Sequence, residues 1–185
     1  MPNAKPAQRN RRSVYVHRTR GQRDPFFETF NQPGFDKSCE LRDTSTITPQ
    51  ALTLINSEET NDRALAFAAR AIKEADADEY VIRRVFELAY GRQPGSVELR
   101  EALEFWKRAT AIQARTKYKP RTWPTEITRE AIDAESGKPF TFKEKLVLYE
   151  NYVPDLQPHE VDARTRGLAD LCLAVFNSNE FAYVD

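Results

Sequence analysis

Residue types that commonly carry chemistry are sparse in this sequence, and their spacing forms no catalytic or metal-binding set. The two histidines, His17 and His159, lie in unrelated contexts. His159 begins the run HEVD, which lacks the second histidine that a zinc-protease helix places four residues on. We therefore interpret this run as a solvated helix start. The patterns GxSxG, GxGxxG and GxxxxGKS or GxxxxGKT do not occur, so we predict no catalytic, cofactor-binding or metal-ligating residue.

One polar cluster is the candidate binding site of this sequence. It lies between an aromatic-rich stretch and a short apolar helix. Side chains of this kind can bind a sugar or an anion. They can equally satisfy buried backbone groups where an irregular segment docks, and we favour this structural interpretation. The cluster consists of Cys39, Arg42, Thr46, Thr48, Gln50 and Asn56.

The two cysteines, Cys39 and Cys172, are too few for a metal site and form neither a CxxC nor a CxxCH pattern. They can pair in an oxidising compartment, but the sequence gives no distance between them. If Cys172 is unpaired, we expect it in the core as a small apolar residue, because Leu171, Val175 and Phe176 beside it are apolar.

Charge is unevenly distributed along the chain although the net charge is zero. Every charged residue before Asp24 is basic, so the rest of the chain is acidic. A basic arm can contact the phosphates of nucleic acid. Because no nucleic-acid-binding motif follows it, we predict instead that residues 1–12 form a disordered, solvated arm or return to the acidic body. The basic residues before Asp24 are Lys5, Arg9, Arg11, Arg12, Arg18, Arg20 and Arg23.

The apolar spacing predicts a mainly α-helical protein, a compact bundle of four to five helices forming one domain over residues 13–185. Residues 13–17 alternate as a strand does, and residues 24–47 form an irregular, aromatic-rich segment. The predicted helices run from Thr48-Pro49 to Asn56, from a Ser57 cap, from Asp78 to Tyr90 with a stop at Gly91, from a Ser96 cap past Trp106, and from an Asp162 cap to Asn177. Phe181 and Tyr183 are expected in an extended tail.

Residues 116–160 contain five prolines and are predicted to be a long, partly ordered insertion before the last helix. Short helices are expected over 128–135 and 142–149, with Trp123, Tyr149 and Tyr152 as anchors. No apolar run is long enough to span a membrane, so no membrane insertion is expected.

Several blocks together resemble one known family. They are RRSVYV at 11–16, FFETF at 26–30, Cys39-x-x-Arg42 followed by TITPQALTLIN at 46–56, AYGRQP at 89–94, FTFKEKLVLYENYVPDLQP at 140–158 and LADLCLAVFNSNEFAYVD at 168–185. The chain resembles the C-terminal domain of unknown function of planctomycete-type secreted proteins, in which a planctomycete cytochrome c domain is often also present. The resemblance extends from Arg11 to Asp185.

The resemblance implies a fragment of a longer polypeptide that begins with a signal sequence. The location would then be extracytoplasmic, whereas it would be cytoplasmic if Met1 is the true start. A haem would sit in a separate domain with a CxxCH motif, so no cofactor is expected in this chain. The expected partners are the other domains of the longer polypeptide, and nucleic acid is not expected to be one.

The family has no settled activity, so the resemblance assigns no catalytic residues. We expect a non-catalytic helical module with a structural or interaction role. One alternative is that the chain is part of an enzyme acting on polysaccharide or in redox chemistry. Its cleft would then lie between this chain and a missing domain, and Cys39, Arg42, Gln50 and Asn56 would line it. The other alternative is nucleic-acid contact through the basic arm.

Overall fold

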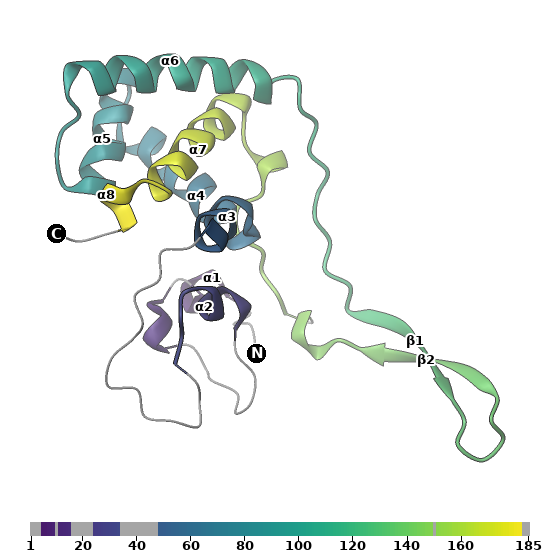
Figure 1. The fold of residues 1–185 in the computed structure, drawn as a ribbon. Coiled ribbons are helices and arrows are strands. Elements are labelled where there is room, and N and C mark those ends of the chain that lie inside the picture. The colour runs from purple at the N-terminus through teal and green to yellow at the C-terminus, as the bar shows by residue number, and fades with distance from the viewer. Residues whose placement is uncertain (1–4, 10, 16–23, 34–47, 150, 183–185) are drawn as a thin grey trace. The chain divides into compact units, whose positions relative to one another are not determined.

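The computed structural model describes residues 5–9, 11–15, 24–33, 48–149 and 151–182 (Figure 1). Most of the regular structure in these ranges is helical, which confirms the mainly α class. The elements are α1 (Pro6–Arg9), η1 (Ser13–Tyr15), α2 (Pro25–Thr29), α3 (Thr48–Asn56), α4 (Glu58–Glu74), α5 (Asp78–Tyr90), α6 (Ser96–Gln113), β1 (Glu126–Ile132), β2 (Pro139–Lys145), η2 (Val147–Tyr149), η3 (Pro158–Glu160), α7 (Ala163–Phe176) and α8 (Asn179–Ala182).

The chain divides into two compact units. One comprises Met1–His17 and Pro120–Asp155, and the other comprises Arg18–Lys119 and Leu156–Asp185. The second is the helical unit, and it contains the five helices that the apolar spacing predicts. Whether both units form the single domain expected over residues 13–185 stays a prediction.

The core of the helical unit lies around α7, which packs against both α4 and α6 (Figure 1). The apolar stripes of these helices and of α5 meet there, as their three- and four-residue spacing requires. Cys172 is fully buried among them, which confirms its predicted place in the core. The largest fully buried side chains are Ile82, Leu168, Val81, Val85 and Cys172.

Most helix boundaries follow the predicted capping residues. The Ser57 hydroxyl accepts a hydrogen bond from the Thr60 N–H, and the Asp162 carboxylate accepts one from the Thr165 N–H. Gly91 ends α5 in the left-handed conformation at φ 70°, which glycine adopts without strain. These observations confirm the predicted starts of α4 and α7 and the predicted end of α5. The HEVD run likewise leads into α7 through its Asp162 cap.

The predicted Ser96 cap of α6 is wrong, because the cap position is Gly95 and Ser96 is the first helical residue. Gly95 has no side chain that could cap the helix. Instead, the Gly95 N–H donates to the Glu98 carboxylate at 2.7 Å. A carboxylate at the third helical position can thus stabilise this start from inside the helix.

Helices α6 and α7 cross at very short range where Gly167 faces Thr110. A Cβ atom at Gly167 would lie 2.6 Å from the Thr110 backbone nitrogen and 2.8 Å from its Cα. No side chain fits at that distance, so the crossing requires glycine.

The predicted short helices over 128–135 and 142–149 are wrong for most of their length. Strands β1 and β2 form an antiparallel hairpin there, in which Arg129 pairs with Phe142. In the second strand the aromatic residues Phe140 and Phe142 recur at a period of two, which suits a strand rather than a helix. The hairpin turn is held by Asp133, whose side chain accepts hydrogen bonds from the Glu135 N–H at 3.0 Å and the Ser136 hydroxyl at 2.6 Å.

The ends of the chain differ from prediction in three places. Ser13–Tyr15 form a 3₁₀ turn, so the strand predicted over residues 13–17 is wrong in its described part. Pro6–Arg9 form one short helical turn within the arm that was expected to be disordered. Phe181 lies in α8 rather than in an extended tail, and its ring centroid is 4.9 Å from that of Phe176.

Within the described ranges, no helix is both long and apolar enough to cross a membrane.

Candidate functional site

The predicted polar cluster lies largely outside the described residues. Cys39, Arg42 and Thr46 are not described, and Thr48 is described only as the first residue of α3. The arrangement that would make these residues a binding site is therefore not tested, and the disulfide between Cys39 and Cys172 stays open.

Gln50 and Asn56 are the two cluster members with described side chains. The half-buried Gln50 amide donates to the Thr29 carbonyl at 3.1 Å and so ties α3 to the end of α2. This contact is of the kind that the structural interpretation of the cluster expects. Asn56 is exposed at the end of α3.

Arg92 is the centre of an ion-pair clamp in the turn between α5 and α6. Its Nη1 and Nη2 donate to the two Glu98 oxygens at 2.9 and 2.7 Å. Its Nε and Nη2 donate to the two Glu180 oxygens at 2.6 and 2.8 Å. The planar guanidinium thus binds two carboxylates in a bidentate way, which a lysine could not do. The clamp fixes α8 to the start of α6.

Two aromatic rings complete the Arg92 clamp. The guanidinium carbon lies 5.6 Å from the Phe86 ring centroid and 5.5 Å from that of Tyr90. The Tyr90 hydroxyl lies 2.9 Å from the Ser178 hydroxyl, next to α8. The AYGRQP block is therefore a structural junction that holds the C-terminal part of the chain.

The clamp changes the protonation of its carboxylates. Hydrogen bonds from Arg92, and next from the Gly95 N–H, lower the pKa of Glu98 to about 2. The hydrogen bond from Arg92 also lowers the pKa of Glu180. Both carboxylates are therefore ionised near neutral pH and act as acceptors, so neither is poised to transfer a proton.

A second junction joins α5, α6 and α7 around Trp106. The indole N–H of Trp106 donates to the Arg164 carbonyl at 2.8 Å, and the Arg164 guanidinium lies 4.7 Å from the centroid of the same indole. Arg164 also donates to the Asp78 carboxylate at 2.6 Å. This arrangement satisfies the polar atom of a buried tryptophan and carries no site chemistry of its own.

A hydrogen-bonded chain at the end of α6 contains a partly buried carboxylate, that of Asp170. Gln113 donates to the Asp170 carboxylate at 2.8 Å and accepts from the Tyr118 hydroxyl at 2.7 Å. Burial raises the pKa of Asp170, and the hydrogen bond from Gln113 partly opposes that shift. Asp170 was not among the predicted site residues, although a carboxylate within the apolar run LADLCLAV was a signal for it.

Arg166 closes the same region by holding the end of α6 to the segment before α7. Its guanidinium donates to the Pro158 carbonyl at 2.9 Å, to the Val161 carbonyl and to the Gln113 carbonyl. It also lies 5.2 Å from the Tyr118 ring centroid. These contacts satisfy backbone carbonyls at the end of α6 and in the segment before α7, which is a structural role.

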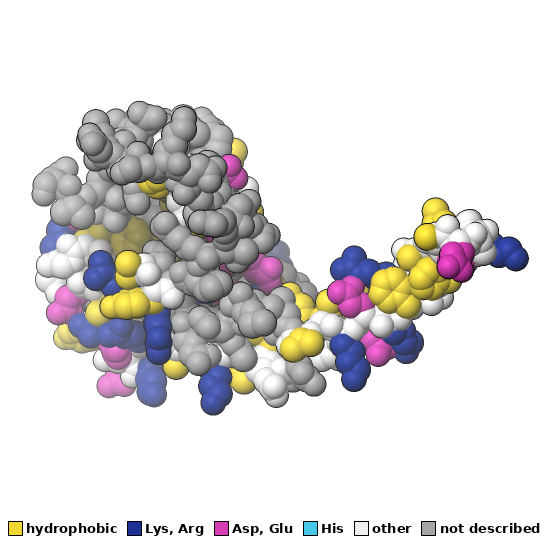
Figure 2. Space-filling model, turned by 90° about the horizontal axis from the view of Figure 1, so that it is seen from below, with side chains coloured by type: hydrophobic (Ala, Val, Ile, Leu, Met, Phe, Trp, Pro, Cys, Tyr) yellow, Lys and Arg dark blue, Asp and Glu magenta, His cyan; other side chains and the backbone are white. Residues whose placement is uncertain are grey.

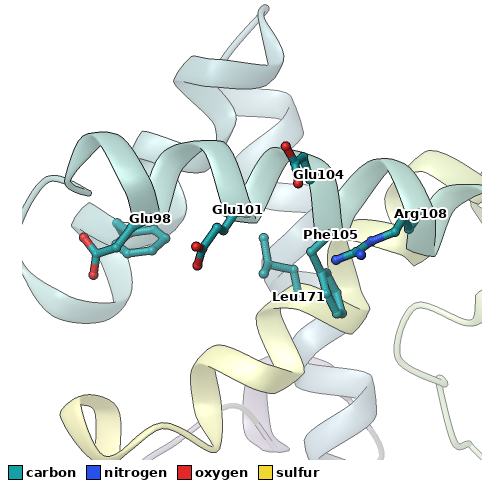
Figure 3. Close-up of a pocket in the computed structure, with 8 residues that line it drawn as sticks. Glu98, Glu101, Glu104, Phe105, Arg108 and Leu171 are labelled. Carbon is teal, nitrogen blue, oxygen red and sulfur yellow. The ribbon is translucent and has the colours of Figure 1, made fainter.

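An open hollow of about 420 Å³ lies along the flank of α6 (Figure 3). Its floor is apolar and its rim carries charged side chains. Such a hollow can take an apolar side chain of a partner beside a complementary charge. Its lining residues are Phe86, Glu98, Glu101, Ala102, Glu104, Phe105, Arg108 and Leu171.

Among the residues that the structure describes, no group of three or more His, Cys, Asp or Glu side chains is placed to hold a metal ion. The Cys172 thiol is not poised as a nucleophile, because burial raises its pKa.

Residues 2–106 match the PSD1 family, whose description is a protein of unknown function (DUF1553). The match covers more than half of the 185 residues, and the chain belongs to this family. No curated protein and no solved structure matches the chain. The family match includes the Arg92 clamp block and ends at Trp106, so the resemblance of the following residues stays a prediction.

Proposed function

We propose that this chain is a non-catalytic helical module of a larger planctomycete-type secreted protein, with a structural or interaction role. Its partners are the other domains of that polypeptide, and its extracytoplasmic location follows from them. The observation that carries the proposal is the apolar face of the hairpin formed by β1 and β2.

The hairpin has two chemically different faces. Ile127, Ala131, Phe140 and Phe142 share one face with the Arg129–Glu144 ion pair, because residues of a strand alternate between the two sides of a sheet. The Phe140 and Phe142 rings are 6.0 Å apart and are 48% and 42% exposed. Figure 2 shows hydrophobic side chains gathered along the hairpin, at the right of the view, among basic and acidic ones.

Ion pairs hold the register that places these rings together. Lys143 pairs with Glu126 across the strands at 2.7 Å, and Arg129 pairs with Glu144. Such exposed pairs contribute little stability, so they select the register rather than hold the hairpin together.

A two-stranded hairpin with an exposed apolar face is only marginally stable in water. Covering that face with a neighbouring domain removes the apolar surface from water and stabilises the hairpin. This supports an interaction role and requires no catalytic group in this chain.

The test uses the longer polypeptide that the proposal implies. The region encoded upstream of Met1 is sequenced first, since an in-frame stretch with a signal peptide is expected there. The upstream domains are then produced separately and titrated with this chain in a calorimeter. Replacing Phe140 and Phe142 with serine should weaken the binding at least about tenfold, because the apolar contact is lost.

Ile132→Ser is the matched control, because Ile132 is 73% exposed and lies on the opposite face of the hairpin. It should leave the binding unchanged. Equal binding by the wild-type chain and the Phe140/Phe142 variant would refute the proposal.

The two alternatives from the sequence stay predictions. The shared enzymatic cleft depends on Cys39 and Arg42, which lie outside the described residues. Nucleic-acid contact through residues 1–12 would be recognised by binding that weakens steeply with salt and disappears when the arm is deleted.

A further inference from the structure

A row of exposed side chains runs along one flank of α6, apart from the face that packs in the core. Val97, Phe105 and Ile112 are 53%, 36% and 66% exposed. Glu101 and Arg108 lie between them at helical spacing, so all five share one flank. We call these five residues the α6 flank. Its middle overlies the hollow described above.

The close-up confirms which side chains face the same way. In Figure 3, Glu101, Phe105 and Arg108 lie on the side of α6 that faces Leu171 of α7, whereas Glu104 points away. Phe105 and Leu171 supply apolar surface between the two charges. This strip is apolar at its centre, with the Glu101 carboxylate on one side and the Arg108 guanidinium on the other. Such a composition is typical of a contact surface.

The two charges of the flank have no ion-pair partner in the described part of the chain. Glu98, on the same helix, is held by Arg92, and neighbouring helices show i to i+4 pairs such as Arg83 with Glu79. No such pair is found for Glu101 or Arg108. A surface with one unpaired acid and one unpaired base can bind a partner that places a base opposite the acid and an acid opposite the base.

We propose that the α6 flank is an interface with a second copy of this chain, in which the two α6 helices pack antiparallel about a two-fold axis. In such an interface the same patch is used by both copies. An axis midway between residues 104 and 105 places Glu101 opposite Arg108 of the second copy, and Arg108 opposite its Glu101. The same axis places Val97 opposite Ile112 of the second copy, while both Phe105 rings lie beside the axis.

The self-complementarity of the flank is what selects a second copy as the occupant. One two-fold operation pairs apolar with apolar positions and forms two opposite-charge contacts. An unrelated partner would need the same pattern by coincidence. One helix pair makes a small interface, so the dimer should be weak, with a dissociation constant on the order of micromolar.

This inference goes beyond the proposed function, because it concerns the helical unit and does not depend on what covers the hairpin. The test is sedimentation velocity of the full chain over a wide concentration range. The average mass should rise from the 21.3 kDa of one chain toward twice that value. High salt should weaken the association, because Glu101 and Arg108 are exposed charges and salt screens their attraction.

Charge reversal provides the decisive arm of the test. Arg108→Glu places two carboxylates opposite each other in both symmetric contacts, and Glu101→Arg places two guanidinium groups there. Each variant alone should dimerise about tenfold more weakly or not at all. An equal mixture of the two variants should associate again, because every contact in the mixed dimer pairs an acid with a base.

Lys107→Glu is the matched control. Lys107 is also exposed on α6 but lies off the flank, so the variant should dimerise as the wild type does. Circular dichroism melting checks that each variant keeps the helical fold. The proposal is overturned if the wild-type chain stays monomeric at all concentrations, if Arg108→Glu dimerises like the wild type, or if the mixture stays monomeric.

Discussion

Arg92 holds Glu98 through two hydrogen bonds, from Nη1 to Oε2 at 2.9 Å and from Nη2 to Oε1 at 2.7 Å. The same guanidinium binds Glu180, which lies 88 residues further along the chain. One side chain therefore joins the start of α6 to the last described helix. The Phe181 ring of α8 also lies against the Phe176 ring, with the centroids 4.9 Å apart.

The Arg92 clamp predicts a loss of stability in acid. The pKa of Glu98 is lowered from 4.5 to about 2, so the folded state holds the ionised form more strongly than the unfolded state does. The stabilising contribution is fully present above pH 4.5 and is lost as the pH falls toward 2. Glu98→Gln should therefore be less stable than the wild type near neutral pH, and the difference should shrink across this window.

Urea unfolding at a series of pH values measures this difference. Glu104→Gln is the control, because Glu104 is exposed on the same helix and points to the other side of it from Glu98 (Figure 3). A Glu98→Gln variant whose stability keeps a constant offset from the wild type across the window would contradict the prediction.

The helix crossing at Gly167 predicts a large effect of one methyl group. Gly167→Ala would place a Cβ 2.6 Å from the Thr110 backbone nitrogen, so α6 and α7 must move apart. We expect the free energy of unfolding to fall by about 1 to 3 kcal/mol, although alanine favours the helix. Urea unfolding monitored by circular dichroism gives the value.

Gly95→Ala is the matched substitution, because its new Cβ would meet only the Glu98 side chain, at 3.4 Å. It should cost less than Gly167→Ala. Similar losses in both variants would show that the close approach of the two helices is not the cause.

Asp170 predicts the opposite dependence on pH. Burial raises its pKa above 3.8 in the folded state, so the folded chain binds more protons than the unfolded chain between the two pKa values. Stability contributed by this group is therefore present at low pH and falls as the pH rises. Asp170→Asn removes the buried charge and still accepts the hydrogen bond from Gln113.

We expect Asp170→Asn to be more stable than the wild type at neutral pH and equal to it below pH 3.8. Thermal melts at the two pH values measure the difference. Asp76→Asn, at an exposed bend, is the control and is not expected to raise the stability. A lower melting temperature for Asp170→Asn at neutral pH would indicate that the charge serves another contact.

Helices α3 to α7 were predictable because their signals are local. Apolar spacing located α3 to α7, and Ser57, Gly91 and Asp162 marked ends that the structure confirms. A capping side chain bonds to a backbone N–H within one helical turn, so the capping residue can be recognised from neighbouring residues in the sequence. Ser96 was the exception. Gly95 occupies the cap position, and the carboxylate of Glu98 inside the helix does the work expected of the Ser96 hydroxyl.

The hairpin was predicted wrongly because its pairing is not local. Residues 126–132 read EITREAI, in which Glu, Arg and Ala favour helices. A strand is stabilised by cross-strand contacts, here between β1 and β2. The helix or strand propensity of neighbouring residues does not predict these contacts.

The sequence by itself determined the mainly α class, most helix boundaries, the burial of Cys172 and the family resemblance, since each depends on residues close together in the chain. Only the tertiary structure decided that Arg92 binds Glu180, that Gly167 faces Thr110 and that the α6 flank lies exposed. These relationships join residues far apart in the chain, and their geometry is set by how the helices pack.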